Sequence, residues 1–148
     1  MDWQLEFLMV TRTLLAALFG AFVGWERENR GQDAGMRTYA AVALGACTFG
    51  LISTHATNQI DTRIAAQVVS GIGFLGAGLI MKEQGRATGL TTAATLWSTA
   101  AVGLAMAFGM YTVSILTALL TFGILSAHHL PGWKHLARKH DNTPNKSS

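Results

Sequence analysis

Charged side chains are scarce in this 148-residue chain, at 13% of residues against about 25% in ordinary soluble domains. Half of the residues are hydrophobic. This balance argues against an enzyme with a soluble core and indicates a small integral membrane protein. Cysteine is nearly absent too. Cys47 is the single one, so no internal disulfide can form.

The first residues lack the positive charge that opens a secretory signal, since they carry Asp2 and Glu6 instead. We therefore expect the first apolar run to be a permanent span. The net charge of +3 is too small to indicate a nucleic-acid partner. No nucleophile stands beside a base, so we expect neither an enzyme nor a cofactor.

Five apolar segments each approach the ~20 residues that a helix needs to cross a bilayer. They are residues 5–25, 38–54, 64–81, 90–108 and 111–127. The predicted fold is an all-α, polytopic membrane bundle of about five transmembrane helices within residues 1–127. Residues 128–148 should form a cytoplasmic juxtamembrane segment and a disordered tail. The last two spans touch at Gly109 and Met110, which favours a tight antiparallel hairpin over a merged helix or a re-entrant segment.

Basic residues are distributed unevenly among the predicted connections. The first loop, the third loop and the tail hold nine Lys and Arg residues, whereas the second loop holds only Arg63. Positive charge marks the cytoplasmic side. We therefore expect the N-terminus outside and the C-terminus in the cytoplasm.

The first cytoplasmic connection, GWERENRGQDAGMRT, alternates acidic and basic residues. Glu26 and Arg30 lie four positions apart and can pair if the helix continues past the membrane. Gly31 and Gly35 should break that helix. The segment is either a solvated, self-neutralised loop or a place where Glu26 and Arg27 contact other helices or a partner.

Three ordered motifs carry a family resemblance: GWERE with AGMRTYAAVALGA, then GIGFLGAGLIMKE, then GLTTAATLWSTAAVGLAMAFGMY. Together they resemble the MgtC/SapB family of bacterial inner-membrane proteins, from Gly24 to about Tyr111. The chain departs from the family pattern at Met36 and Tyr39, where leucine and histidine are usual, and at Thr91, where some members have asparagine. Many members continue into a soluble ACT-like domain, whereas here we expect the membrane domain and a short tail alone.

The resemblance implies a role in adaptation to low magnesium and in membrane ion homeostasis. It implies regulation of other inner-membrane proteins, including the F-type ATP synthase, rather than magnesium pumping. Intracellular survival, and hence virulence, is implied for some members. Besides the lipid bilayer, the expected partners are therefore other inner-membrane proteins, with a homo-oligomer as a further possibility.

The glycine run Gly71–Ile80 also matches G-x-G-x-x-G, but no strand precedes it and no acidic residue follows about 20 positions later. We interpret the match as coincidental. Glycine lets membrane helices approach closely. Gly71 and Gly78 share one face with Gln67 and Ser70, while Gly73 and Gly76 lie toward the other side. We expect a central packing helix with two small faces, or alternatively bare backbone that lines a polar path.

The fourth span gathers five hydroxyl residues into one stripe at helical spacing. Each hydroxyl bonds either a carbonyl of its own helix or a neighbouring helix. Alternatively, the stripe lines a hydrophilic cleft or forms a docking face for another membrane protein. Trp97 flanks the stripe and is equally compatible with ordinary packing. The motifs and stripes together give our candidate functional residues, namely Glu26, Arg27, Arg37, Thr38, Gly71, Gly73, Gly76, Gly78, Gly89, Thr91, Thr92, Thr95, Trp97 and Ser98.

Arg12 is the only charge well inside a span, and such charges often mark function. It either snorkels to the outer surface or pairs with Glu6 or Asp61. Metal sites are not expected. The histidines of the tail lack partners at ligand spacing, and arginines compete for the carboxylates of the first loop.

Two functions fit these patterns. The first is a small regulatory bundle that docks on another membrane protein through its small-residue and hydroxyl faces. The second is an oligomeric transporter or channel for an ion or small solute, whose path the hydroxyl stripe and the glycine backbone would line. A third, weaker possibility is a purely structural subunit.

Overall fold

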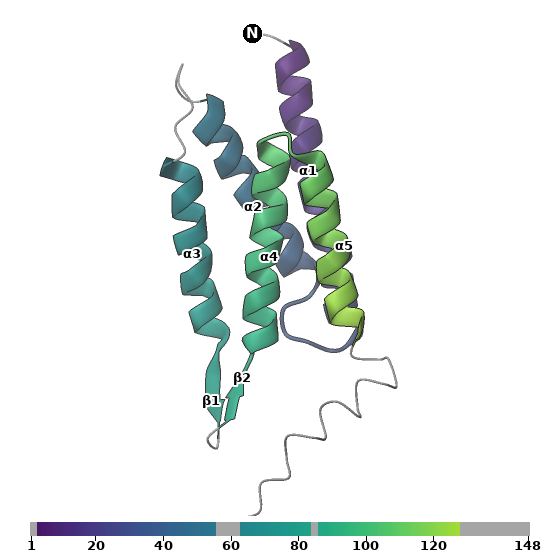
Figure 1. Cartoon of the computed structure of the whole chain (residues 1–148), viewed down its shortest axis with the longest axis vertical. Coiled ribbons are helices and arrows are strands. Elements are labelled where there is room, and N and C mark those ends of the chain that lie inside the picture. Colours follow the sequence, from purple (N-terminus) through teal and green to yellow (C-terminus); the bar gives the residue numbers. More distant parts are fainter. Residues whose placement is uncertain (1–2, 56–62, 84–85, 128–148) are drawn as a thin grey trace, which may run out of the picture.

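A computed structural model describes residues 3–55, 63–83 and 86–127 of the chain. These residues contain five helices: α1 (Trp3–Asn29), α2 (Met36–His55), α3 (Arg63–Leu79), α4 (Leu90–Ala107) and α5 (Tyr111–Ala127). They lie side by side as one bundle (Figure 1). The predicted all-α bundle is confirmed. The predicted tail, residues 128–148, lies outside the described part.

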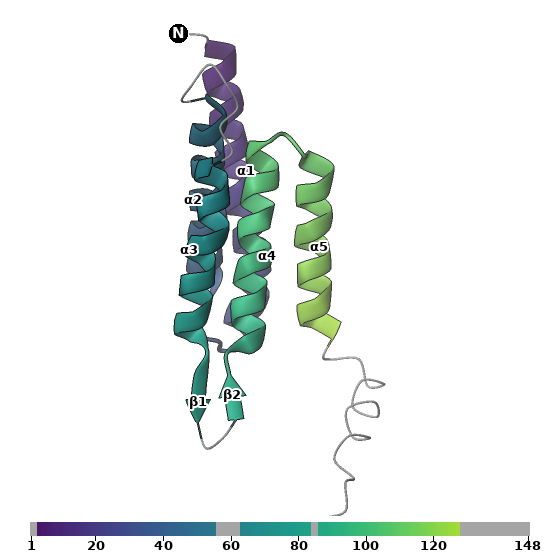
Figure 2. The same ribbon diagram turned by 60° about the vertical axis from the view of Figure 1, so that its left-hand side comes forward.

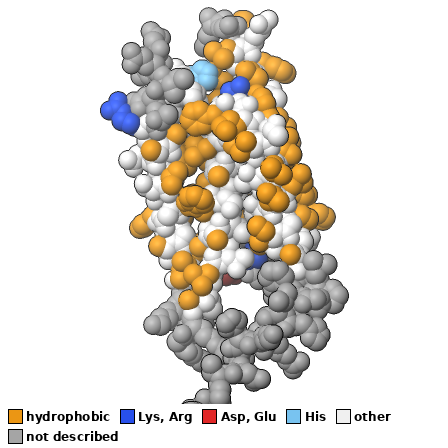
Figure 3. Space-filling model, viewed as in Figure 1, with side chains coloured by type: hydrophobic (Ala, Val, Ile, Leu, Met, Phe, Trp, Pro, Cys, Tyr) orange, Lys and Arg blue, Asp and Glu red, His pale blue; other side chains and the backbone are white. Residues whose placement is uncertain are grey.

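Three of these helices, α1, α2 and α4, are long and apolar enough to cross a membrane. The other two have 17 residues each, which gives a helix of about 25 Å. Large apolar side chains cover the outside, with Phe74 82% and Phe7 74% exposed. On the face in Figure 3, charged side chains lie near the two ends and hydrophobic ones between them. Such a surface suits a lipid environment.

Helix α4 is the centre of the bundle, because it packs against each of the other four helices. Figure 2 shows it between α3 and α5. Glycines bring the central helices together. A Cβ at Gly20 of α1 would lie 2.5 Å from the Tyr39 carbonyl oxygen, and one at Gly50 of α2 would lie 2.6 Å from the Ala107 Cβ. Both distances are too short for real atoms, so these crossings require glycine.

The expectation that the glycine run forms a central packing helix is wrong for the chain alone. Helix α3 lies at the edge of the bundle, against α2 and α4 (Figures 1 and 2). A Cβ at Gly71, Gly73 or Gly78 would meet no described atom within 4 Å, and only Gly76 has a neighbour, the Ala93 Cβ at 3.5 Å. The close packing occurs instead at Gly20 and Gly24 of α1, a G-x-x-x-G spacing that the sequence analysis overlooked.

A short antiparallel hairpin, β1 (Met81–Glu83) and β2 (Arg86–Thr88), joins α3 to α4. The predicted third span therefore runs two residues too far, since α3 ends at Leu79. Gly89 then begins α4 with φ +81°, where a Cβ would collide with the Leu79 carbonyl. At the other end of α4, Gly109 has φ +73°, and Met110 donates back to the Ala105 carbonyl at 2.8 Å. This is a Schellman ending, and it produces the predicted α4–α5 hairpin.

Candidate functional site

Helix α1 continues four residues past its predicted span, to Asn29, and this carries Glu26 and Arg27 into the bundle. Both side chains are buried, at 7% and 6% exposure. Glu26 forms the expected ion pair with Arg30 one turn later. The alternative of a solvated loop is therefore wrong for Glu26 and Arg27, since both are buried and Arg27 contacts other parts of the fold.

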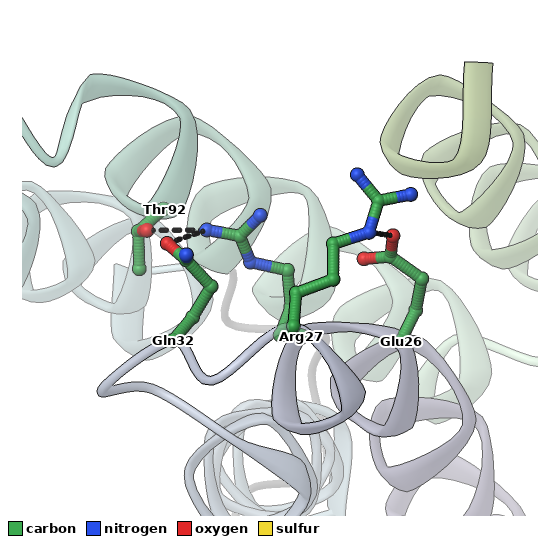
Figure 4. Close-up of polar contacts among 5 residues, drawn as sticks. Glu26, Arg27, Gln32 and Thr92 are labelled. Carbon is green, nitrogen blue, oxygen red and sulfur yellow. Dashed lines mark hydrogen bonds and ion pairs between the residues drawn. The ribbon is translucent and has the colours of Figure 1, made fainter. Parts of the chain in front are cut away.

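The Arg27 guanidinium reaches across to the start of α4 (Figure 4). Its Nη2 donates to the Thr92 hydroxyl at 2.8 Å and to the Gln32 side-chain oxygen at 2.9 Å. Gln32 arrives there because α1 ends in a Schellman turn, with Gly31 at φ +63° and the Gln32 amide bonded to the Arg27 carbonyl at 3.1 Å. Sequence analysis missed Gln32, although the glycine before it signals the turn.

Tyr39 adds a second buried contact between α2 and α4. Its side chain is fully buried, and its hydroxyl lies 2.6 Å from the Thr95 hydroxyl. Sequence analysis noted Tyr39 only as a departure from the family pattern. A polar aromatic residue on an apolar helix face needs a partner, and that rule could have found it.

The hydroxyl stripe of α4 divides between two surroundings. Thr92, Thr95 and Thr99 are buried, whereas Thr91 is exposed and Ser98 is half-buried. Thr95, Ser98 and Thr99 donate to carbonyls of their own helix at 2.8–3.2 Å. The prediction that the hydroxyls bond their own or a neighbouring helix is thus confirmed for these three. Thr91, Thr95 and Ser98 also border a cleft of about 340 Å³ between α4 and α5, whose far wall includes Thr121.

A larger groove of about 580 Å³ lies between α2 and α3. Gly45 and Gly71 face it from opposite walls, and Thr38 and Gln67 are its polar residues. Thr38 thus lies in the groove, away from the Arg27 contacts. The remaining candidates Arg37 and Trp97 are exposed, the latter at 50%. The structure therefore does not gather all candidates into one place.

Arg12 is held at the opposite end of α4. Its Nη1 donates to the Ala107 carbonyl at 2.9 Å, its Nε donates to the Tyr111 hydroxyl at 2.8 Å, and its guanidinium lies 5.5 Å from the centre of that ring. A cation suits this place because the C-terminal end of a helix is partly negative. Arg12 forms no ion pair with Glu6 in the described part of the chain, and Asp61 lies outside it. Snorkelling to the outer surface stays a prediction.

No group of three His, Cys, Asp or Glu side chains that could hold a metal ion occurs among residues 3–55, 63–83 and 86–127. The four histidines of the tail fall outside those ranges. Glu28, one of the carboxylates considered for magnesium, accepts a hydrogen bond from the Met36 amide at 2.9 Å and so caps α2. The absence of a metal site stays a prediction.

Comparison with known proteins identifies the family of this chain. The model of the MgtC family matches residues 13–130, which include Arg27, Tyr39 and the whole of α4. The chain belongs to the MgtC family. Together with the three helices able to cross a bilayer, this makes it a membrane protein, and the resemblance seen in its three motifs is confirmed.

Relatives of this MgtC-family protein include the protein named "Putative magnesium transporter YhiD" from Escherichia coli (strain K12). It is 37% identical over 129 residues, which cover 81% of this chain and 60% of YhiD. Protein MgtC of Salmonella typhimurium (strain LT2) is 48% identical over 108 residues, covering 73% of this chain and 47% of that protein. Protein MgtC of Brucella abortus (strain 2308) is 51% identical over 96 residues, 64% of this chain and 40% of the relative. The chain thus spans 60% or less of these relatives. No solved structure matches it.

Proposed function

We propose that this protein is a multi-pass protein of the bacterial inner membrane that serves adaptation to low magnesium and membrane ion homeostasis. It would do so by docking on and regulating another membrane protein, such as the F-type ATP synthase. The magnesium link extends the printed name of YhiD to this chain. The orientation is the predicted one, with the N-terminus outside and the C-terminus in the cytoplasm.

The uncovered surface of α3 carries this proposal. A Cβ added at Gly71, Gly73 or Gly78 of α3 would meet no described atom within 4 Å, and the groove between α2 and α3 presents bare backbone at Gly45 and Gly71. Membrane helices associate through close backbone contact at small residues. A surface of this kind supports docking of a partner's transmembrane helix, because lipid chains gain nothing from exposed glycine.

A substitution within the groove tests docking separately from folding. Gly71→Leu adds a side chain where the chain itself leaves space, and Gly123→Leu on α5 is the matched control, since Gly123 also has no neighbour within 4 Å. A strain that lacks this protein would be complemented with each variant and grown across magnesium and pH. Proximity to the ATP synthase would be measured by cross-linking from a cysteine at position 71.

We expect Gly71→Leu to abolish complementation and Gly123→Leu to keep it, at equal protein levels. In the separate variant with a cysteine at position 71, we expect cross-linking to the synthase. If Gly71→Leu complements fully, the groove is not the docking surface. If position 71 cross-links to no subunit of the synthase, the ATP synthase is not the partner. Loss of complementation in Gly71→Leu would then still support docking on another membrane protein.

The cleft between α4 and α5 favours transport as a second candidate. Ser98 and Thr121 each donate their proton to their own helix, so their oxygen lone pairs remain to accept hydrogen bonds in the cleft, whereas the Thr95 hydroxyl also contacts the Tyr39 hydroxyl. Such oxygens suit a partly hydrated cation. Flux of magnesium into liposomes would be compared for the natural chain and for the triple alanine variant at Thr91, Thr95 and Ser98. Flux that is unchanged in this variant rules out the path.

A further inference from the structure

Arg27 is a buried cation that has no carboxylate partner among the described residues. The ion pair of this region joins Glu26 to Arg30 instead. Glu28 is occupied in capping α2. The Arg27 Nε is buried and donates no hydrogen bond within the described part of the chain. A buried charge is costly unless it is paired and all its donors are satisfied.

The group that Arg27 approaches is itself partly positive. Thr92 lies in the first turn of α4, an 18-residue helix that begins at Leu90. The first amides of a helix have no carbonyl partner within it, and they give its N-terminal end a partial positive charge. The residue before the helix is Gly89, which supplies no side-chain cap. A guanidinium and a helix N-terminus therefore point at the same place with the same sign of charge.

We infer that Arg27 and the first turn of α4 form a binding site for a phosphate group. Its donors come from Arg27 Nε, the Thr92 hydroxyl, the Gln32 amide nitrogen and the amides of the turn. Several donors from different directions suit a tetrahedral anion with many oxygens, and both arginine and a helix N-terminus favour phosphate. Gln32 is exposed in its loop, so the site has a wall open to the outside of the bundle.

Two sources can supply this chemistry, the phosphate of a lipid headgroup and a free phosphate of the cytoplasm. The inference does not depend on the proposed function, because binding is measured on the isolated chain. The protein would be purified in a maltoside detergent, which contains no phosphate. Its thermal unfolding would be followed by tryptophan fluorescence.

The first arm titrates inorganic phosphate against chloride at matched ionic strength. The second arm dopes the micelles with phosphatidylglycerol and compares them with micelles doped with diacylglycerol, which has the same tails and no phosphate. A ligand at ten times its Kd favours the folded state about elevenfold, which raises the unfolding temperature. Stabilisation in the first arm identifies free phosphate, and stabilisation only in the second identifies a lipid headgroup.

Three variants decide whether the effect comes from this site. Arg27→Gln removes the charge, and Thr92→Val removes one hydroxyl with little change of shape. Arg37→Gln removes an exposed arginine of the same connection and is the control. We expect Arg27→Gln to abolish the shift, Thr92→Val to weaken binding about tenfold, and Arg37→Gln to leave it unchanged.

Two results would overturn the inference: no stabilisation by either source, or an equal stabilisation of the Arg27→Gln or Thr92→Val protein. Should Arg27→Gln fail to fold, Thr92→Val decides alone. Loss of the Thr92 hydroxyl leaves the contact between Thr95 and Tyr39 and the core contacts of α4 in place.

Discussion

Two glycines that look alike in the sequence should respond in opposite ways to the same substitution. Gly103 of α4 crosses α2, and a Cβ there would collide with the Ala43 carbonyl oxygen and lie 2.9 Å from the Ala46 Cβ. Gly73 of α3 meets no described atom within 4 Å. We predict that Gly103→Ala destabilises the bundle and that Gly73→Ala does not.

The magnitude follows from the difference between the two variants. Both gain the same helix propensity, about 0.5–1 kcal/mol for glycine to alanine, so this gain cancels in the comparison. What remains is the overpacking cost at Gly103. A backbone carbonyl cannot rotate away, so α2 must shift as a whole, and such overpacking costs about 1–3 kcal/mol. Gly103→Ala should therefore unfold more easily than Gly73→Ala by that amount.

Reversible unfolding in mixed micelles with increasing denaturing detergent measures both free energies, with tryptophan fluorescence as the signal. Gly20→Ala at the crossing of α1 and α2 should behave like Gly103→Ala, since its Cβ would lie 2.5 Å from the Tyr39 carbonyl oxygen. Equal stabilities for Gly103→Ala and Gly73→Ala, within half a kcal/mol, would refute this packing of α4 on α2.

Three further predictions concern polar contacts and topology. Arg12→Gln should lower the free energy of unfolding by about 2 kcal/mol and Tyr111→Phe by about 1 kcal/mol, because the first loses two charge-assisted hydrogen bonds and the second loses one. In the same unfolding assay, the effects of the two substitutions should be less than additive in the double variant. Tyr39→Phe should cost about 1 kcal/mol through its lost bond to Thr95, and no change would mean that this contact is absent in the membrane. Alkaline phosphatase fused after His55 should be active and the same enzyme fused to the C-terminus inactive, whereas activity at the C-terminus would contradict the assigned orientation.

Sequence alone predicted the helices well, because hydropathy and length decide where a membrane helix can lie. The predicted fourth and fifth spans differ from α4 and α5 by one residue at most. The prediction failed where the backbone conformation is not determined by the polarity of the side chains. Residues 81–88 were predicted only as a span end and a loop. The β-hairpin there, and the left-handed backbone of Gly89 that follows it, are not indicated by hydropathy.

The glycine faces show a second limit of sequence reasoning. A helical wheel states which glycines share a face, but it does not state which face a neighbour covers. Gly71 and Gly78 share a face as predicted, yet that face is bare, while Gly20 and Gly24 form the contact with α2. Coverage depends on how all five helices cross, which is a property of the assembled bundle and not of any one segment.

The dipole of α4 places the two arginines of α1, Arg12 and Arg27, in opposite electrostatic surroundings. Arg12 and Arg27 are 15 positions apart, about 22 Å along α1, and α4 has 18 residues. Because α1 and α4 run in opposite directions (Figure 1), Arg12 meets the negative end of α4 at the Ala107 carbonyl and Arg27 meets its positive end at Thr92. The helix dipole stabilises the first arginine and opposes the second. Arg12 therefore needs nothing beyond the chain, whereas Arg27 needs an anion, and this asymmetry makes Arg27 rather than the intramembrane Arg12 the better candidate for a ligand site.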